Sequence, residues 1–317
     1  MNKKSTNQEN FLFCIDSNYN FQCYLSICSL LNNLQKAPKI FIIHNHPKSF
    51  EAYKDLLVSK NQKLKIIIKE FNNSNINFEK FFNVDNKHIS LATMYRLYLE
   101  YYIDHTIDKI LYLDADVFAV NSFGEEVSKT FNKLIKSPFV LGAFDVVNYN
   151  KGTKLKPYFN AGVLFIDLKK WREQNITQKL LEEYDLNPNY KYHDQDILNN
   201  VFKSSFFNID EKLNLHISLE DNAIKRFRRK IKENAIFVHY VGSTKPWNYE
   251  GFLKLNAYLY HELIKKNNYG NLNLPKKNKK FIIAFTISNF TKILFSKFVL
   301  YYFSNLYKQL KNGENLI

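Results

Sequence analysis

The chain contains little cysteine, glycine or proline. Its 317 residues include 3 Cys, 8 Gly and 7 Pro, and no two cysteines form a C-x-x-C pair. An odd number of cysteines without such spacing argues against a disulfide framework and favours a reducing compartment. Neither G-x-G-x-x-G nor G-x-x-x-x-G-K-[ST] occurs. The phosphate site of a dinucleotide fold or of a P-loop enzyme is therefore not expected, and a metal ion with a basic side chain would have to bind phosphate.

Long apolar runs are missing at both ends of the chain. The first ten residues are polar, and the apolar stretch after them covers only residues 11–15. This pattern predicts no secretory signal and hence a cytoplasmic protein. Near the C-terminus the longest uncharged run is residues 281–291, whereas a membrane-spanning helix needs about 20 apolar residues.

Acidic residues are too few to balance the basic ones, and the net charge is +15. Such a chain binds nucleic acid, an anionic membrane or phosphorylated substrates, and charge alone does not choose among them. Residues 275–317 hold eight Lys and one Glu, among aromatic and aliphatic residues interrupted by polar ones at helical spacing. We predict a domain of residues 1–270 and a basic, amphipathic helical tail of residues 271–317 that binds an anionic membrane surface. A helix packed on the domain or pairing with another copy is the alternative.

Short apolar runs alternate with stretches of helical spacing. Strands are predicted at residues 11–15, 39–44, 63–70, 109–114, 139–144, 161–168 and 235–240. Helices are predicted at residues 21–34, 48–59, 91–103, 168–184 and 194–202. This alternation predicts an α/β domain with a mostly parallel central sheet flanked by helices.

Two carboxylates close a continuous apolar strand in the segment LYLDADVF. Asp114 and Asp116 are two residues apart on an extended segment and therefore point the same way. Ligands of open α/β sheets bind beyond the carboxyl ends of strands. Two like charges held together are costly unless a cation lies between them, and hard divalent cations share oxygen ligands with phosphates. The pair thus predicts a metal that carries a diphosphate, although a D-x-D alone is often only a turn or a cap.

The segment IFVHYVGSTKPW offers two partners for these carboxylates. His239 ends another predicted strand and could reach the same edge as the two Asp. An imidazole with two carboxylates suits Mn²⁺ better than Ca²⁺. Lys245 beside a diphosphate would neutralise the charge that develops on the leaving group. A structural histidine and a solvated loop lysine are the alternatives.

Polar groups also stand at the ends of two other elements. Asp16, Asn18 and Tyr19 follow the first strand, where the aromatic ring could stack on a base and the polar groups could bind a ribose. An Asx turn with a helix cap explains the same residues. Asp194 and Gln195 begin a predicted helix and could face a sugar, although Asp at a helix N-terminus is favourable for capping alone.

Seven segments, in order, make the chain resemble glycosyltransferase family 8 and, within it, the bacterial lipopolysaccharide galactosyl- and glucosyltransferases. They are CIDSNYNFQCYLSICSLL, HISLATMYRLYL, KILYLDADVFAV, LGAFD, YFNAGVLFIDLKKWR, YHDQDILNNVF and HYVGSTKPW. The resemblance implies a GT-A type fold, a UDP-sugar donor, Mn²⁺ or Mg²⁺, and retention of anomeric configuration. Its membrane-associated members carry basic, aromatic tails, which implies a cytoplasmic enzyme peripheral on the inner face of the bacterial inner membrane.

The resemblance also implies roles for single residues. The metal ligands are Asp114, Asp116 and His239. The uridine-binding residues are Asp16, Asn18 and Tyr19. The donor-sugar residues are Arg96, Asn160, Asp194 and Gln195, the last two being the candidates for catalysis. The remaining binding residues are Lys245 at the diphosphate, Gly242 in the same loop and Asp145 in the pocket.

A same-face attack of the acceptor is the favoured retaining route, because the Gln195 amide is a poor nucleophile and Asp194 is tied to sugar hydroxyls. We expect Asp114→Ala to abolish transfer and leave the fold intact.

The acceptor would be a saccharide or glycolipid such as the lipopolysaccharide or lipooligosaccharide core, although residues 214–234, with the basic run at 225–232, match no family pattern. The alternatives are a nucleotidyltransferase, which would carry a Gly- and basic-rich first loop, and a non-catalytic nucleic-acid binder. Since much of the charge lies in the tail, no nucleic-acid partner is expected.

Overall fold

The computed structural model describes residues 9–71, 90–148, 155–187, 190–220, 231, 234–252 and 254–267. Contacts divide the chain into two units, Met1–Ser243 and Thr244–Ile317. The predicted tail at residues 271–317 and nearly all of the basic run at 225–232 lie outside the described residues, so the tail and its boundary stay predictions. In the part of the chain that is described, no helix is both long and apolar enough to cross a membrane.

A seven-stranded sheet forms the centre of the first unit, in the order β3-β2-β1-β4-β7-β6-β8. Its strands are β1 (Asn10–Ile15), β2 (Lys39–His44), β3 (Lys65–Glu70), β4 (Lys109–Leu113), β6 (Leu141–Asp145), β7 (Phe159–Asp167) and β8 (Phe207–Asn208). β1 to β4 pair in parallel, as do β6 and β8, while β7 runs antiparallel to β4 and β6. The predicted α/β fold with a mostly parallel sheet is confirmed.

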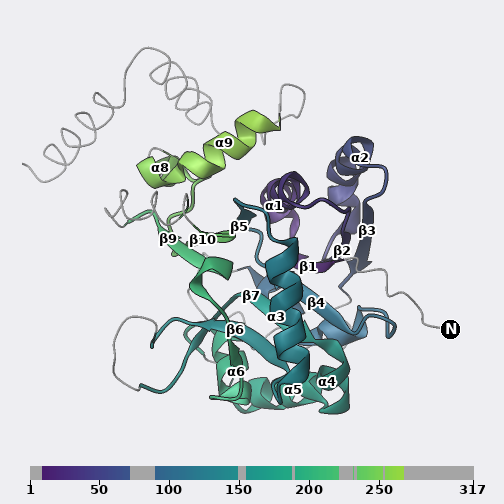
Figure 1. The fold of residues 1–317 in the computed structure, drawn as a ribbon, viewed down its shortest axis with the longest axis vertical. Coiled ribbons are helices and arrows are strands. Elements are labelled where there is room, and N and C mark those ends of the chain that lie inside the picture. The colour runs from purple at the N-terminus through teal and green to yellow at the C-terminus, as the bar shows by residue number, and fades with distance from the viewer. Residues whose placement is uncertain are drawn as a thin grey trace, which may run out of the picture. The chain divides into compact units, whose positions relative to one another are not determined.

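Helices cover both faces of this sheet because alternate strand residues are apolar on each side. On one face, Leu12, Tyr112 and Ile166 share a core with Trp171 and Leu198. The elements of this face are η5 (Leu91–Tyr101), α4 (Leu168–Glu173), α5 (Ile176–Leu186) and α6 (His193–Phe202), of which the last three are gathered together in Figure 1.

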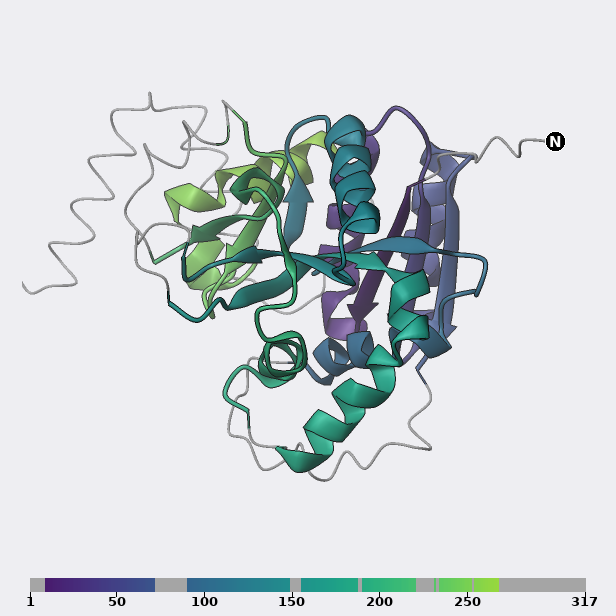
Figure 2. The ribbon, with the colours of Figure 1, turned by 60° about the horizontal axis from the view of Figure 1, so that its bottom comes forward.

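The opposite face carries α1 (Asn20–Asn33), α2 (Glu51–Lys60) and α3 (Gly124–Lys136). The ring of Phe131 in α3 packs 4.9 Å from that of Phe165 in β7, whose neighbours Leu164 and Ile166 face the other core. Figure 2 shows the blue-green α3 and the green α5 on opposite sides of the sheet. The two 3₁₀ turns η1 (Ser17–Tyr19) and η2 (Pro47–Phe50) lead into α1 and α2.

A second sheet of three strands brings a later part of the chain to the end of β4. It consists of β5 (Val117–Ala119), β10 (Phe237–Val241) and β9 (Leu215–Ser218), which follows the turn η6 (Glu211–Leu213). β10 pairs antiparallel with β5 and parallel with β9, so that His239 lies opposite Val117 and His216. The strand predicted at residues 235–240 exists, but it belongs to this second sheet and not to the central one.

Two of the predicted helices differ from those in the structure. The helix predicted at residues 168–184 is two helices, because Asn175 between α4 and α5 has a φ of 52°, in the left-handed region. The helix predicted at residues 91–103 is the 3₁₀ helix η5. Helix α3 was not predicted, although it has Glu125 in its first turn and Lys136 in its last, which is the favourable order for the helix dipole.

The described part of the second unit is a short helical segment. It contains α8 (Tyr249–Phe252), the 3₁₀ turn η7 (Leu255–Ala257) and α9 (Tyr258–Lys266). Aromatic pairs hold it together, with the ring centroids of Trp247 and Tyr260 5.8 Å apart and those of Phe252 and His261 4.2 Å apart.

Candidate metal and donor-sugar site

Asp114, Asp116 and His239 lie together just beyond the end of β4. One potential ligand atom from each residue lies within 4.8 Å of the other two. Nε2 of His239 is 3.2 Å from Oδ1 of Asp116 and 4.0 Å from Oδ2 of Asp114. The structure thus brings together the three side chains predicted as metal ligands.

Backbone pairing places these side chains. The chain turns directly after β4, with the Val117 N–H donating to the Asp114 carbonyl at 3.1 Å, and then enters β5. β5 pairs with β10, and the Tyr240 N–H donates to the Asp116 carbonyl at 3.2 Å. The histidine therefore reaches the carboxylates across an antiparallel pair, as a neighbour of the strand that follows them.

Gly162 of β7 leaves room for the cluster. A Cβ atom added there would lie 2.2 Å from Cε1 of His239 and 3.0 Å from Oδ2 of Asp114. Real Cβ atoms do not approach that closely, so only glycine fits beside the imidazole. Two carboxylates and one imidazole nitrogen facing a common point are a suitable donor set for a divalent first-row metal ion. The residues present therefore fit such an ion.

Arg96 in η5 lies between Asp114, a predicted metal ligand, and Asp194, a residue predicted to bind the sugar. Its Nη2 lies 2.9 Å from Oδ1 of Asp114 and its Nε lies 3.0 Å from Oδ2 of Asp194. Its Nη1 donates to the Ala161 carbonyl at 2.7 Å. Burial acts to lower the pKa of Arg96, but the two carboxylates outweigh it and raise that pKa above its ordinary value. The guanidinium is therefore permanently charged and bridges the two acids.

Asp194 is itself nearly buried at the start of α6. Burial raises the pKa of its carboxyl to about 6, although the Arg96 charge acts in the opposite direction. The Nε–H of Arg96 donates to the Thr93 carbonyl at 3.0 Å, so the contact of Arg96 with Oδ2 of Asp194 is an ion pair and not a hydrogen bond.

Asn160 of β7 and Gln195 of α6 contact each other next to this pair. The Asn160 amide nitrogen donates to Oε1 of Gln195 at 3.2 Å, and the Ala161 N–H donates to the same oxygen at 3.0 Å. The Gln195 amide nitrogen donates to the Tyr158 hydroxyl at 3.1 Å. All four residues predicted at the donor sugar thus lie in one connected network with Asp114.

The first loop holds Asp16, Asn18 and Tyr19 in the turn η1 after β1. Oδ1 of Asp16 accepts the Asn18 N–H at 2.8 Å, and Oδ2 accepts the Ser90 hydroxyl. The turn is thus an Asx turn, which was the structural alternative to nucleotide binding for this loop. Burial, followed by the negative charges of Asp116 and Asp16, raises the pKa of Tyr19 to about 12.

The remaining predicted residues have different settings. Asp145, at the end of β6, is buried and its Oδ1 accepts the Val147 N–H at 3.0 Å and the Asn148 N–H at 3.3 Å. Gly242 has a φ of +90°, a conformation that L side chains rarely adopt. Lys245 belongs to the second unit, where its carbonyl accepts the Asn248 N–H at 3.0 Å.

Sequence reasoning missed several residues that hold the predicted ones. The Tyr112 hydroxyl donates to Oδ1 of Asp114 at 2.5 Å, and Nδ1 of His239 lies 3.1 Å from Oδ1 of Asn214. Tyr112 stands two residues before Asp114, so its side chain could have been expected on the same side of the strand. Asn214 carries no such signal, because only the pairing of distant strands brings it to His239.

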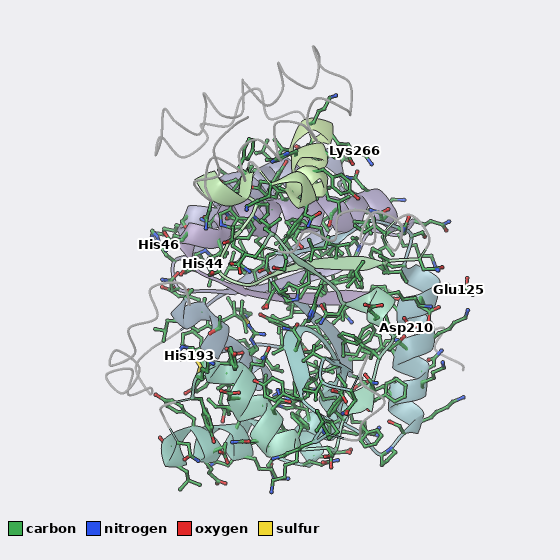
Figure 3. All side chains as sticks on the ribbon, turned by 90° about the vertical axis from the view of Figure 1, so that its left-hand side faces the viewer. His44, His46, Glu125, His193, Asp210 and Lys266 are labelled. Atoms are coloured by element: carbon green, nitrogen blue, oxygen red, sulfur yellow. The ribbon has the colours of Figure 1, made fainter. Side chains whose placement is uncertain are left out.

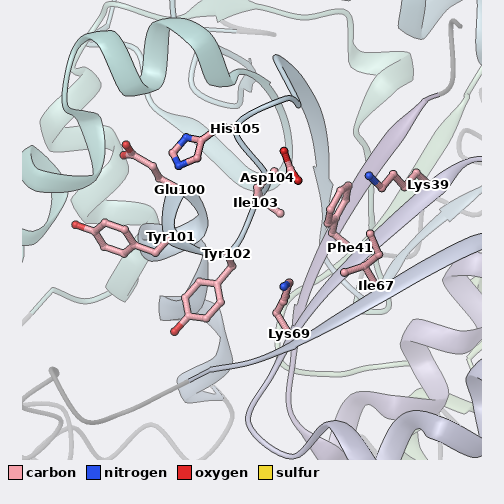
Figure 4. Close-up of a pocket in the computed structure, with 10 residues that line it drawn as sticks. All are labelled: Lys39, Phe41, Ile67, Lys69, Glu100, Tyr101, Tyr102, Ile103, Asp104 and His105. Carbon is pink, nitrogen blue, oxygen red and sulfur yellow. The ribbon is translucent and has the colours of Figure 1, made fainter.

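His44, His46 and the cavity drawn in Figure 4 do not belong to the carboxylate cluster. His44 and His46, labelled in Figure 3, are joined through the His46 N–H, which donates to Nδ1 of His44 at 2.7 Å. Burial lowers the pKa of His44 to about 4. The cavity in Figure 4, about 530 Å³, includes Lys39 at the start of β2 and Tyr101 at the end of η5, and it shares no residue with the carboxylate cluster.

Comparison with known proteins agrees with this geometry. The model of the glycosyl transferase family 8 matches residues 10–251. The chain is 27% identical over 249 residues to the lipopolysaccharide 1,2-glucosyltransferase of Escherichia coli strain K12, a match that covers 75% of this chain and 72% of that protein. It is 26% identical over 260 residues to the lipopolysaccharide 1,3-galactosyltransferase of Salmonella typhimurium strain LT2, covering 78% of this chain and 76% of that protein.

Among solved structures, the galactosyltransferase LgtC in complex with donor and acceptor sugar analogs superposes with a TM-score of 0.65. The sequences are 24% identical, and the match covers 87% of this chain and 99% of that one. The apo form of the glycosyltransferase GlyE of Streptococcus pneumoniae TIGR4 gives a TM-score of 0.56 at 22% identity, over 82% of this chain and 64% of that one. At these identities the likeness shows the shared fold, which is of the GT-A type.

Proposed function

We propose, because this chain belongs to glycosyl transferase family 8, that it is a retaining hexosyltransferase that uses a UDP-sugar. The acceptor is a saccharide of the lipopolysaccharide or lipooligosaccharide core. The observation that carries the proposal is the cluster of Asp114, Asp116 and His239 at the carboxyl end of β4. Curated relatives that transfer glucose or galactose to lipopolysaccharide, and match over more than two thirds of their length, support the acceptor class.

The three clustered side chains would hold Mn²⁺, with Mg²⁺ as the alternative ion. A bound divalent cation neutralises the diphosphate of the donor and the charge that develops on the leaving UDP. Lys245 adds a positive charge to that diphosphate, and Gly242 shapes the loop that precedes it. The bridge from Asp114 through Arg96 to Asp194 then ties the metal-binding residues to the residues that bind the sugar.

The first loop binds the uridine. Tyr19 offers a ring for the base, while Asn18 is exposed and offers an amide to the base or ribose. Asp16 is held by two hydrogen bonds, so its carboxylate is fixed before the donor arrives. Such a prepared site reduces the ordering cost of binding.

Transfer proceeds by attack of the acceptor hydroxyl on the same face as the departing UDP. Asp194 is paired with Arg96, and the Gln195 amide carries no charge, so neither is a suitable covalent nucleophile. Both orient the hexose, together with Asn160. The positive charge of Arg96 keeps Asp194 in place while sugar hydroxyls bind to it.

The C-terminal tail places the enzyme on the cytoplasmic face of the inner membrane, near a glycolipid acceptor. The basic and aromatic composition of residues 271–317 supports this location. A vesicle-flotation experiment with anionic and neutral lipids, comparing the full chain with a chain ending at residue 270, tests it. Equal flotation of both chains on anionic vesicles would contradict a role for the tail.

A UDP-release assay tests the activity. UDP-glucose, UDP-galactose and their N-acetyl derivatives are each incubated with the enzyme, Mn²⁺ and a truncated lipooligosaccharide, and the anomeric configuration of the product is read by NMR. We expect release with one UDP-hexose, dependence on acceptor and metal, and a retained anomer. Asp116→Asn should be inactive under the same conditions. An inverted product, or full activity in a chelator, would overturn the proposal.

The other functions considered are less well supported. A nucleotidyltransferase or another nucleotide-sugar enzyme with paired carboxylates is disfavoured, because the family match spans residues 10–251 and includes the whole cluster. A non-catalytic nucleic-acid binder would show a steep salt dependence of DNA affinity and no binding of UDP.

A further inference from the structure

Asn214 connects the two halves of the candidate site. It is fully buried between η6 and β9. Its amide nitrogen donates to Oδ1 of Asn160 at 3.0 Å, and its Oδ1 lies 3.1 Å from Nδ1 of His239. Asn214 therefore contacts the predicted metal ligand His239 on one side and Asn160, a residue predicted to bind the sugar, on the other.

The direction of these hydrogen bonds is fixed by the backbone. The N–H of Gly162 donates to Oδ1 of Asn160 at 3.0 Å, and a peptide N–H can only donate. Oδ1 of Asn160 must therefore be an oxygen, and the Asn214 atom that faces it must be the amide nitrogen. It follows that the Asn214 oxygen faces His239.

An amide oxygen can only accept, so Nδ1 of His239 must carry the proton. The lone pair of the neutral imidazole is then on Nε2, the atom that lies 3.2 Å from Asp116. We infer that Asn214 is a positioning residue which holds His239 in the Nδ1–H tautomer and thereby keeps Nε2 free to bind the metal. The part of this inference that concerns metal rests on the proposed function.

The same argument extends to the sugar side. The N–H of Ala161 donates to Oε1 of Gln195, and the Asn160 amide nitrogen donates to that oxygen as well. The Gln195 amide nitrogen must then point to the Tyr158 hydroxyl. Two consecutive peptide groups of β7 thus orient the metal-side histidine and the sugar-side amide, and Asn214 transmits the first of these effects.

Packing alone does not select the tautomer. The His216 ring stands edge to face against the His239 ring, with centroids 5.4 Å apart. This contact restricts the ring plane, but it does not distinguish a protonated Nδ1 from a protonated Nε2. The Asp116 carboxylate, 3.2 Å from Nε2, favours a proton on Nε2 when no metal is bound, whereas the Asn214 oxygen favours a proton on Nδ1. The Nδ1–H form of the neutral ring therefore depends on Asn214.

The tautomer can be measured without metal or substrate. In the ¹⁵N-labelled, metal-free chain, ¹⁵N shifts and long-range couplings of the imidazole report which nitrogen carries the proton, and His239→Gln identifies the signal. We expect the Nδ1–H form in the wild type and a mixture or the Nε2–H form in Asn214→Ala. Asn214→Asp keeps an acceptor for Nδ1 and should retain the Nδ1–H proton, although it loses the donor to Oδ1 of Asn160. An Nδ1–H tautomer that persists unchanged in Asn214→Ala would overturn the inference.

Manganese binding supplies the second readout, by electron paramagnetic resonance of free Mn²⁺. Loss of a group that orients a metal-binding histidine typically weakens metal affinity about 10–100-fold, and we expect that range for Asn214→Ala. Asn121→Ala is the matched control, because its amide also bonds next to β10, to the Ala235 carbonyl at 2.6 Å, but does not contact His239. Equal losses in the two variants would overturn the inference. A tautomer change in a chain that binds no Mn²⁺ would support the positioning role and refute the metal-dependent proposed function.

Discussion

Nη2 of Arg96 lies 2.9 Å from Oδ1 of Asp114, so a buried guanidinium holds one oxygen of a carboxylate whose other oxygen faces the metal cluster. The Tyr112 hydroxyl donates to that same Oδ1. The two oxygens of Asp114 therefore have separate tasks, one structural and one directed at His239. Asp116, by contrast, faces the histidine, with its Oδ1 3.2 Å from Nε2 of His239.

This difference changes the expected result of removing Asp114. Asp114→Ala should abolish transfer but also destabilise the fold by about 3 kcal/mol, because it leaves a buried Arg96 with one of its two acid partners. This expectation replaces the one made from sequence, that the fold would be unaffected.

Asp116→Asn has the same shape as the wild type and removes a like charge, so we expect the free energy of unfolding to change by less than about 1 kcal/mol, together with lost Mn²⁺ binding. Urea unfolding of the two metal-free variants measures both stability changes. Equal stabilities would show that the ion pair of Arg96 with Asp114 contributes nothing to the stability of the fold.

The raised pKa of Asp194 predicts a pH dependence of stability. Burial raises this pKa to about 6 in the folded chain, above the ordinary value of 3.8. Between these values the folded state binds more protons than the unfolded state, so stability falls as pH rises. The unfolding free energy of the wild type relative to Asp194→Asn should decrease by about 2 kcal/mol from pH 4 to pH 7 and then remain constant.

Urea unfolding at intervals of half a pH unit tests this. Taking the difference between the two proteins cancels the titration of the other carboxylates. A difference that grows as pH rises would mean that the Arg96 ion pair outweighs burial and that the folded-state pKa is lowered instead.

The carboxylate pair could be predicted from sequence because the signal is local. The apolar strand that leads into Asp114 and Asp116 predicts both where these side chains lie and in which direction they point. The position of His239 at the end of a predicted strand suggested the same role, but only the family resemblance favoured that role over a structural histidine. Its approach depends on β5 pairing with β10, which joins residues more than a hundred positions apart, and no local pattern announces that pairing.

The parts that could not be predicted are set by tertiary contacts. Asn214 lies in a stretch without a recognisable pattern, and its function depends on two hydrogen bonds to distant residues. The contacts of the Arg96 guanidinium with Asp114, Asp194 and the Ala161 carbonyl could not be foreseen either. An arginine in an apolar helical segment shows neither its partners nor its burial. Sequence periodicity predicts which residues are buried, but not which polar groups meet inside.

Gly162→Ala should weaken metal binding without touching any ligand directly. The new Cβ would lie 2.2 Å from Cε1 of His239, so the imidazole must move away from the carboxylates. We expect Mn²⁺ affinity to fall by at least about tenfold and stability to fall by about 1–3 kcal/mol. Gly124→Ala is the control, because its Cβ would only approach a flexible Leu34 side chain at 3.3 Å at the start of α3. Unaltered Mn²⁺ affinity in Gly162→Ala would show that His239 is not confined at this position.

Asp145 should affect the acceptor more than the donor. Its Oδ1 accepts the N–H groups of Val147 and Asn148, and its Oδ2 accepts the Asn148 amide at 2.8 Å, so this carboxylate fixes the segment that follows β6. Asp145→Ala removes these acceptors from residues 146–148, a stretch that we expect to face the acceptor. We expect the KM for the acceptor to rise about tenfold, equivalent to ~1.4 kcal/mol, with the KM for the UDP-sugar unchanged. Steady-state kinetics with each substrate varied in turn measures the split. Asp104→Ala serves as control, since Asp104 also caps a turn, at Thr106, but on an exposed loop after η5. A rise confined to the KM for the donor would place Asp145 at the UDP-sugar instead.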